Sequence, residues 1–239
     1  MKSVRLGSSG LKVSEVCLGT MTFSREADEQ ESFAIADYFA DQGGTFFDTA
    51  DVYSHGASEE TLGRWLKARG GRDRLVIATK VFGAMGEGAN DRGLSRRHIV
   101  SAVEESLRRL QVDYIDLYQI HRWDPSSSLE ETVRALDNLV RQGKVRYLGC
   151  SNVRAFQLLS FLHYADGLGL ERFVCLQQHF NALNRSLELE LLPLCRREGV
   201  GIIPYNPLAG GFLTGKYSGK ALPKGSRMEA FEFYNRRYY

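Results

Sequence analysis

Short apolar runs alternate with longer amphipathic segments along the whole chain. The runs cover residues 16–19, 45–49, 75–79, 114–120, 146–150, 174–179 and 201–205. Runs of this length are typical of strands that are buried on both faces of a parallel sheet. The opening segment, 4–14, has a different pattern, and Ser8, Ser9 and Gly10 in its middle predict a β-hairpin.

The segments between the runs have helical periodicity. Ser95 can cap a helix that places Ile99 and Val103 on one stripe, and Ser128 with Glu131 forms a capping box before another helix. We expect further helices over 29–42, 58–69, 155–164 and 186–198, with glycine at helix ends at positions 43, 70, 143 and 199. Strands that alternate with helices at this spacing predict βαβ units.

Two α/β architectures fit this alternation, an open doubly wound sheet and a (β/α)8 TIM barrel. The first usually carries Gly-x-Gly-x-x-Gly after an early strand, and this chain has no such motif. We therefore predict a single barrel domain over 1–239 with an N-terminal β-hairpin. Seven strands and six intervening helices can be counted, and 218–239 holds no eighth strand, so we expect the eighth βα unit to be missing.

Composition and charge exclude several classes of protein. Lys and Arg number 31 against 29 Asp and Glu, a net charge of +2, which gives no electrostatic footprint for nucleic acid or anionic lipid. No apolar stretch reaches the roughly 18 residues of a membrane span, and the N-terminus lacks the apolar core of a signal peptide. Four cysteines without a Cys-x-x-Cys pair suit reduced thiols. We expect a soluble, cytoplasmic protein.

Polar residues stand at the predicted carboxyl ends of the strands, where barrel enzymes carry their chemistry. Asp48 and Lys80 end two successive strands, Tyr53 lies in the loop between them, and His121 ends the next strand. A lysine ammonium beside a tyrosine lowers the pKa of the phenol, and an aspartate paired with that lysine keeps it charged. A histidine beside them can donate to a carbonyl oxygen. Together they predict a proton donor for a developing alkoxide, which carbonyl reduction requires.

Each of these four residues also has an ordinary structural explanation. A lysine after a strand is most often a solvated loop residue, and Tyr53 alone could be an aromatic at the rim of the barrel. His121 alone is more often a satisfied core histidine, and Asp48 could cap the following turn. The coincidence of all four near the ends of three successive strands favours the functional interpretation.

A glycine-rich segment, 205–216, forms a second cluster. Gly210, Gly215 and Lys216 have the spacing of a P-loop, but Tyr217 follows where a P-loop needs Ser or Thr to hold magnesium. We therefore exclude a P-loop. Small residues, backbone amides and one lysine remain suited to a pyrophosphate bound without Mg²⁺, and a flexible glycine-rich loop is the alternative.

Other residues give weaker signals. Met21, Phe23, Phe82 and Trp123 follow strand ends and predict the apolar wall of a substrate pocket, or else packing at the top of the barrel. The five histidines lack metal-ligand spacing, so no metal site is expected. A barrel glycosidase would need carboxylates facing each other at two strand ends, and we find only Asp48 there.

The chain resembles the aldo-keto reductases, on motifs that run in order along nearly its whole length. These are Leu18-Gly-Thr20, Phe47-Asp-Thr-Ala-Asp-Val-Tyr53, Ser58-Glu-Glu-Thr-Leu-Gly63, Thr79-Lys80, Asp113-Tyr-Ile-Asp-Leu-Tyr-Gln-Ile-His121, Gly143-Lys-Val-Arg-Tyr-Leu-Gly-Cys-Ser-Asn152 and Pro204-Tyr-Asn-Pro-Leu-Ala-Gly-Gly211. The resemblance implies a (β/α)8 barrel that reduces small-molecule aldehydes or ketones to alcohols. It also implies that the cofactor is NADPH, bound extended across the top of the barrel.

The same resemblance assigns roles to individual residues. It implies Tyr53 as the general acid, Lys80 as the residue that lowers its pKa, Asp48 as the partner of Lys80, and His121 as the residue that orients the carbonyl. The implied substrate pocket consists of Tyr53, Phe82, His121 and Trp123. The implied cofactor contacts are Gly19, Thr20, Met21, Asp48, Ser151, Asn152, Gln177, Tyr205, Asn206, Pro207, Leu208, Ala209, Gly210, Gly211, Lys216 and Arg227.

Within that set, Ser151, Asn152 and Gln177 would hold the nicotinamide amide and Tyr205 would stack on its ring. The loop over 206–211, with Lys216 and Arg227, would cover the pyrophosphate and adenosine. The residues that grip the adenine ribose phosphate in the family have no counterpart in this chain, so NADP over NAD comes from the resemblance alone.

Potassium-channel β subunits share this fold and many of the motifs. They resemble this chain with Asn in place of His121 and Arg in place of Asn152. A cofactor-binding regulatory subunit with little catalysis is therefore the alternative function, while His121 and Asn152 favour a working reductase of the bacterial type.

Overall fold

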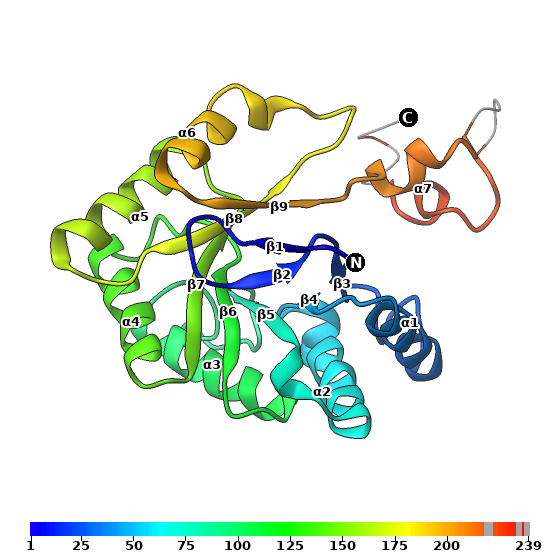
Figure 1. Ribbon diagram of the computed structural model, residues 1–239, viewed down its shortest axis with the longest axis horizontal. Helices are drawn as coiled ribbons and strands as arrows, with labels where there is room; N and C mark the ends of the chain where they lie inside the picture. Colours follow the sequence, from blue (N-terminus) through cyan, green and yellow to red (C-terminus); the bar gives the residue numbers. More distant parts are fainter. Residues whose placement is uncertain (218–221, 233–235, 237–239) are drawn as a thin grey trace.

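Seven parallel strands form one sheet in the computed structural model, which describes residues 1–217, 222–232 and 236 (Figure 1). Each strand pairs with the next strand in chain order, from β3 to β9. The strands are β3 (Cys17–Gly19), β4 (Phe46–Asp48), β5 (Val76–Val81), β6 (Ile115–Ile120), β7 (Val145–Ser151), β8 (Phe173–His179) and β9 (Gly201–Tyr205). Every apolar run predicted from the sequence becomes a strand, with ends that move by two residues at most.

Helices alternate with these strands and follow one another around the outside of the sheet (Figure 1). The α-helices are α1 (Glu29–Asp41), α2 (Ala57–Arg69), α3 (Arg96–Leu110), α4 (Leu129–Arg141), α5 (Ala155–Leu168), α6 (Leu191–Glu198) and α7 (Arg227–Ala230). Short 3-10 helices are η1 (Tyr53–Gly56), η2 (Arg72–Arg74), η3 (Ser186–Glu188) and η4 (Ala209–Thr214). The result is a nearly closed α/β barrel, which confirms the predicted fold class.

The helix predicted over 186–198 is wrong in one respect, because the structure divides it. Residues Ser186–Glu188 form η3, and the α-helix begins only at Leu191. Pro193 explains the break, because its ring would clash with the carbonyl of Leu189 in a continuous helix, whereas proline is tolerated in a first turn.

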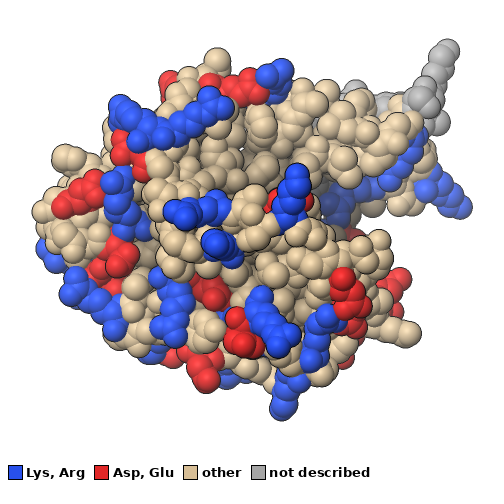
Figure 2. Space-filling view, in the orientation of Figure 1, with Lys and Arg blue, Asp and Glu red and all other residues tan. Residues whose placement is uncertain are grey.

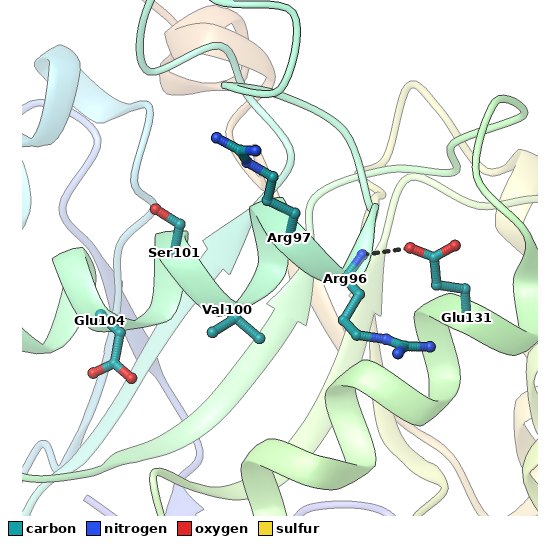
Figure 3. A pocket seen from close by; sticks show the side chains of 6 residues that line it. All are labelled: Arg96, Arg97, Val100, Ser101, Glu104 and Glu131. Atoms are coloured by element: carbon teal, nitrogen blue, oxygen red, sulfur yellow. Dashed lines mark hydrogen bonds between the residues drawn. The ribbon is translucent and has the colours of Figure 1, made fainter.

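The predicted helix starts at Ser95 and Ser128 are confirmed, but the predicted capping box is only half formed. Ser95 Oγ accepts a hydrogen bond from the His98 amide, and Ser128 Oγ accepts one from the Glu131 amide. The Glu131 carboxylate does not accept the reciprocal hydrogen bond from the Ser128 amide. It accepts instead from the Arg96 amide at 2.8 Å and so joins the starts of α3 and α4 (Figure 3).

The N-terminal hairpin, β1 (Ser3–Arg5) with β2 (Lys12–Ser14), lies across the amino ends of the strands. Ser14 Oγ accepts from the amides of Thr45 and Phe46 at the start of β4. Gly7 has φ +60°, and a Cβ there would lie 2.5 Å from the carbonyl oxygen of Gly199. The hairpin therefore closes the base of the barrel and leaves the interior open at the carboxyl ends of the strands.

The barrel interior is filled by a compact apolar cluster near this base. Its buried members come from the hairpin and from five strands: Leu6, Val13, Phe46, Val76, Ala78, Leu117, Cys175 and Ile203. A larger cluster lies between the sheet and the surrounding helices. Because apolar side chains occupy the lower interior, the polar side chains of the strands gather at the opposite end.

Strands β3 and β9 are the two edges of the sheet and do not pair with each other. The described part of 218–239 contains α7 and no strand, and the remaining positions of that segment lie outside the described residues. Arg227 of α7 donates to Glu26 in the loop after β3 at 3.2 Å, so this C-terminal helix contacts the first βα loop. No helix in the described ranges is long and apolar enough to cross a membrane.

Candidate active site

Lys80 is the centre of a buried polar cluster at the carboxyl ends of β4 and β5. Its side chain is 0% exposed, and Nζ donates to Asp48 Oδ2 at 2.6 Å, to the Thr49 carbonyl at 2.7 Å and to Tyr53 Oη at 3.3 Å. The explanation of Lys80 as a solvated loop residue is therefore wrong. A lysine buried in this way needs an anionic partner, which Asp48 provides.

Lys80 remains charged in this environment. Burial on its own would lower the pKa of the ammonium, but the charge of Asp48, the Tyr53 side chain and the hydrogen bonds to both raise it above its ordinary value. The cation is thus fixed beside the phenol oxygen over the whole physiological pH range.

Asp48 uses both of its carboxylate oxygens. While Oδ2 faces Lys80, Oδ1 accepts from Gln119 Nε2 at 3.0 Å and from Gln177 Nε2 at 2.9 Å. Gln119 was not singled out as a site residue from the sequence, although the register of β5 and β6 places it directly opposite Lys80. Two strands thus supply amides that hold the carboxylate in one orientation.

His121 lies beside Tyr53 at the end of β6. The two rings pack edge to face, with centroids 5.8 Å apart and planes at 81°. Burial lowers the pKa of His121 to about 3, and the charges of Lys80 and Arg122 add to this effect. The imidazole is therefore neutral at physiological pH, and it carries one N–H and one acceptor nitrogen.

Tyr53 reaches this cluster from a tightly bent loop. Ser54 and His55, the next two residues, have φ values of 50° and 53°, in the left-handed region that side chains other than glycine adopt at a cost. The loop is fastened to the strands, because the Asp51 amide donates to the Lys80 carbonyl at 3.2 Å and Ser54 Oγ donates to the Phe23 carbonyl at 3.3 Å.

The predicted nicotinamide contacts on β7 and β9 form one hydrogen-bonded group. Asn152 Nδ2 donates to Ser151 Oγ at 2.9 Å and to the His121 carbonyl at 3.0 Å, and Tyr205 Oη donates to Asn152 Oδ1 at 2.9 Å. The bond to the His121 carbonyl joins this group to the Lys80 cluster. Gln177 is oriented differently, since its amide nitrogen faces Asp48 and leaves its oxygen for any further partner.

On the β3 side, Gly19 is exposed, Met21 is half-buried and Thr20 is fully buried. Thr20 Oγ1 lies 2.9 Å from Ser58 Oγ and donates to the Asp48 carbonyl at 3.2 Å. Thr20 therefore fixes the end of β4 against α2, while the two flanking residues are accessible at the mouth.

The loop after β9 is shaped by left-handed residues. Asn206, Ala209, Gly210 and Gly211 all have positive φ, and the Gly210 amide donates to Asn206 Oδ1 at 2.6 Å. A Cβ on Gly211 would lie 3.6 Å from Nζ of the exposed Lys216. Pro207 and Leu208 are exposed on the same loop.

Lys216 and Arg227, the two predicted basic contacts, have different surroundings. Within the described ranges no carboxylate forms an ion pair with Lys216, whereas Arg227 is ion-paired with Glu26. On the face of the molecule shown in Figure 2, basic and acidic side chains are intermixed.

Two aromatic residues of the predicted pocket lie near the mouth. Phe82 is half-buried with the Arg122 guanidinium 5.5 Å from its ring centroid, and Trp123 packs against Phe161 of α5 with centroids 5.3 Å apart. A separate surface hollow between α3 and α4 contains none of the predicted site residues (Figure 3). Its lining residues are Arg96, Arg97, Val100, Ser101, Glu104 and Glu131.

Metal ligands do not gather at this mouth. Across the part of the chain that the structure describes, no three His, Cys, Asp or Glu side chains come together as a metal site. All four cysteines are free thiols, and three of them are buried.

Known proteins resemble this chain over nearly its full length. The sequence profile of the aldo/keto reductase family matches residues 15–234. The protein tas of Escherichia coli is 38% identical over 266 aligned residues, which cover 99% of this chain and 76% of that protein. The uncharacterized oxidoreductase YrpG of Bacillus subtilis is 41% identical, over 90% of this chain and 69% of its own length.

A third relative is named as a channel subunit and not as an oxidoreductase. The probable voltage-gated potassium channel subunit beta of Arabidopsis thaliana is 40% identical over 98% of this chain and 72% of its own length. The family profile covers far more than half of the chain, and all three relatives exceed 30% identity with extensive coverage. The barrel described here, with its polar cluster at the mouth, therefore belongs to the aldo/keto reductase family of oxidoreductases.

Proposed function

We propose that this protein is an NADPH-dependent carbonyl reductase, which converts aldehydes or ketones to alcohols with Tyr53 as the general acid. The observation that carries the proposal is the buried Lys80 ammonium, ion-paired with Asp48 at 2.6 Å and hydrogen-bonded to Tyr53 Oη at 3.3 Å. A phenol in contact with a fixed cation is suited to giving up its proton, because the cation stabilises the phenolate that remains.

The proton moves from Tyr53 Oη to the carbonyl oxygen as negative charge develops on that oxygen. Lys80 stabilises the phenolate by donating to it, and Asp48 keeps the ammonium charged and oriented. Gln119 and Gln177 hold Asp48 in turn, so the donor set needs little rearrangement during the reaction.

His121 orients the carbonyl in this proposal. A neutral imidazole can donate its N–H to the carbonyl oxygen without adding a second positive charge beside Lys80. Its edge-to-face contact with Tyr53 keeps the two donors on the same side of the mouth, where one oxygen can receive hydrogen bonds from both.

The residues at the mouth fit a nicotinamide nucleotide. Ser151, Asn152 and Gln177 offer polar atoms at the ends of β7 and β8, and the Tyr205 ring is held in place by Asn152. Lys216 has no carboxylate partner in the described ranges, and its ammonium lies 3.6 Å from the position of a Cβ on Gly211, which suits an anionic pyrophosphate beside that loop. When bound, NADPH would supply the hydride that reduces the carbonyl carbon.

The four free thiols fit a reducing compartment such as the cytoplasm. We propose a small-molecule carbonyl compound as the partner, because a half-buried phenol at the mouth of a barrel is accessible only to a group that can enter that mouth.

The test is consumption of NADPH by the purified chain in the presence of a generic aromatic aldehyde. Titration with NADPH and NADH by fluorescence quenching provides the binding constants on the same sample. We expect NADPH to bind and its absorbance to decline with formation of alcohol. Binding of NADPH without turnover on a panel of aldehydes and ketones would contradict the reductase.

A cofactor-binding regulatory subunit is the second candidate, since a channel β subunit is 40% identical over 98% of this chain. The assembled contacts of Lys80, Asp48 and Tyr53, together with a neutral His121, favour the reductase. Tight NADPH binding, absence of turnover and co-purification with a membrane protein would select the regulatory subunit instead.

A further inference from the structure

A second buried cluster of charged residues lies beneath the loop that carries Tyr53, and the proposed chemistry does not use it. Glu59 of α2 is 0% exposed. Its carboxylate accepts from Arg109 Nε of α3 at 2.7 Å and from Thr79 Oγ1 of β5 at 2.5 Å. Arg109 itself is only 8% exposed. Three elements of the fold therefore meet in one polar contact under the active-site loop.

The backbone makes room for this arginine. A Cβ on Gly56, which ends η1 and has φ +92°, would lie 2.7 Å from Arg109 Cδ. A Cβ on Gly63 of α2 would overlap the Arg109 carbonyl. Glycine at both positions lets α3 approach closely enough for Arg109 to reach Glu59.

Asp51 joins this cluster to the active-site loop. It is 0% exposed, and its Oδ1 accepts from the Val52 amide at 2.6 Å, next to Tyr53. The Asp51 amide donates to the Lys80 carbonyl of β5 at 3.2 Å. One residue thus connects the backbone beside Tyr53 with the strand that supplies Lys80.

Two buried polar atoms at this point have no hydrogen-bond partner in the described structure. They are Asp51 Oδ2 and Tyr118 Oη of β6, which is also 0% exposed. Buried polar atoms normally have a hydrogen-bond partner, so the lack of one at both atoms requires a physical reason. A protonated Asp51 could donate from Oδ2 toward its neighbours, whereas an ionised Asp51 could only accept.

An ionised Asp51 would have no cation of its own among the described residues, because Arg109 is paired with Glu59. Glu59 from α2 contributes a second carboxylate, and Arg109 from α3 contributes the guanidinium that serves it. Burial raises the pKa of the Tyr118 phenol of β6, and the charges of Asp51 and Glu59 add to this effect. Glu105 lies 3.9 Å from Arg109 Nη1, and the Lys80 ammonium of β5 is turned toward Asp48. Burial and the negative charge of Glu59 raise the pKa of Asp51 to about 7, against smaller opposing effects of Val52, Arg109 and Phe82.

We propose that Asp51 is a positioning residue for Tyr53, which as a neutral acid holds the active-site loop against β5 and on ionisation releases it. The proposal rests on the proposed reductase function for its effect on rate. Ionisation would place an uncompensated negative charge beside Glu59 in a site that water does not reach, and a shift of the Tyr53 loop away from β5 would relieve it.

The matched variant is Asp51→Asn, which keeps the shape and is neutral at every pH. We expect wild-type kcat to fall by about tenfold per pH unit above pH ~7, as for the loss of one required proton. In D51N this decline should disappear, while the rate at pH ~6 stays within about twofold of wild type. Asp73→Asn, an exposed position on η2, is the control and should keep the wild-type profile.

Glu59→Gln supplies a second, directional test. Removing the neighbouring negative charge should move the wild-type inflection to lower pH, since Glu59 is part of what disfavours the ionised form of Asp51. An inflection that stays in place in E59Q, or persists in D51N, would overturn the proposal.

Two measurements do not depend on turnover. Wild type at pH ~6 should show the infrared carbonyl band of a buried carboxylic acid, and D51N should lack it. The hydrogen-exchange protection factors of the amides over 50–56, which remove the intrinsic rise of exchange with pH, should fall above pH ~7 in wild type and stay constant in D51N. If both are seen without any NADPH oxidation, the positioning role stands and the reductase function fails. If neither is seen, the positioning role is refuted even where turnover is found.

Discussion

Lys80 Nζ and Asp48 Oδ2 lie 2.6 Å apart, and the lysine of this pair is completely buried. In the proposed reaction this contact would serve the chemistry as well as the stability of the barrel. Asp48 would keep the ammonium charged for Tyr53, and Lys80 compensates a carboxylate that would otherwise be a nearly buried, unpaired charge.

Replacing Tyr53 by Phe should separate binding from turnover. The variant lacks only the phenol oxygen, so we expect kcat to fall by about 100-fold or more while the dissociation constant of NADPH changes by less than about twofold. Steady-state rates and fluorescence titration measure the two quantities. Unchanged turnover in this variant would refute Tyr53 as the general acid.

Replacing Lys80 by Met should destabilise the protein by about 3–5 kcal/mol, because it leaves Asp48 buried without its cation. Urea unfolding measures the effect. Lys144→Met is the matched control, since Lys144 pairs with Glu104 at the surface and should cost less than about 1 kcal/mol. The double variant with Asp48→Asn should recover part of the loss, and failure to recover would contradict the coupling of the two residues.

His121 should not titrate between about pH 5 and pH 8, because burial and two neighbouring cations lower its pKa to about 3. In the unfolded chain it binds a proton below about pH 6.5. The unfolded state therefore gains protons on acidification that the folded state does not, and His121 lowers stability as pH falls through that range. Imidazole NMR signals, assigned with His121→Gln, test this, and a midpoint near pH ~6.5 would refute it.

Replacing Lys216 by Met should weaken NADPH binding by about tenfold and reduce its dependence on salt, if the ammonium over Gly211 meets the pyrophosphate. Lys67→Met, an exposed position on α2, serves as the control. Equal affinities and salt slopes for the two variants would show that the glycine-rich loop does not contact the phosphates.

Replacing Gly63 by Ala should destabilise the barrel by about 1–3 kcal/mol, because the new Cβ meets the backbone of Arg109 and Leu110. Gly167→Ala in α5 is the control. Nothing lies within 4 Å of a Cβ there, so it should be neutral or stabilising by about 0.5–1 kcal/mol. Thermal unfolding distinguishes the two, and equal effects would contradict the tight contact between α2 and α3.

The strands, most helices and the positions of Asp48, Tyr53, Lys80 and His121 at one mouth follow from the sequence, because burial on both faces and strand-end location leave a readable pattern. The hydrogen-bond partners of those residues could not be predicted from the sequence. Gln119 and Gln177 both contact Asp48, and only the register of neighbouring strands, which no pattern within one strand contains, determines this.

The buried ion pair of Glu59 and Arg109 could not be predicted from the sequence for a different reason. Both residues lie on helices, where charged residues are usually solvated, and they are 50 positions apart. Their burial depends on the bare backbone at Gly56 and Gly63, which lets two helices approach. The half-formed capping box at Ser128 has a similar origin, since the neighbouring helix provides a better donor for Glu131 than its own cap does.

The position of Gly7 against Gly199 and Gly201 also imposes an order on biosynthesis. The hairpin is translated before all seven strands of the barrel, and β9, the strand that Gly7 contacts, is translated last among them. Ser14 can already accept from Thr45 and Phe46 of β4, but Gly7 meets Gly199 and Gly201 only when almost all of the barrel has been translated. Sealing of the base at Gly7 is therefore a late event of maturation.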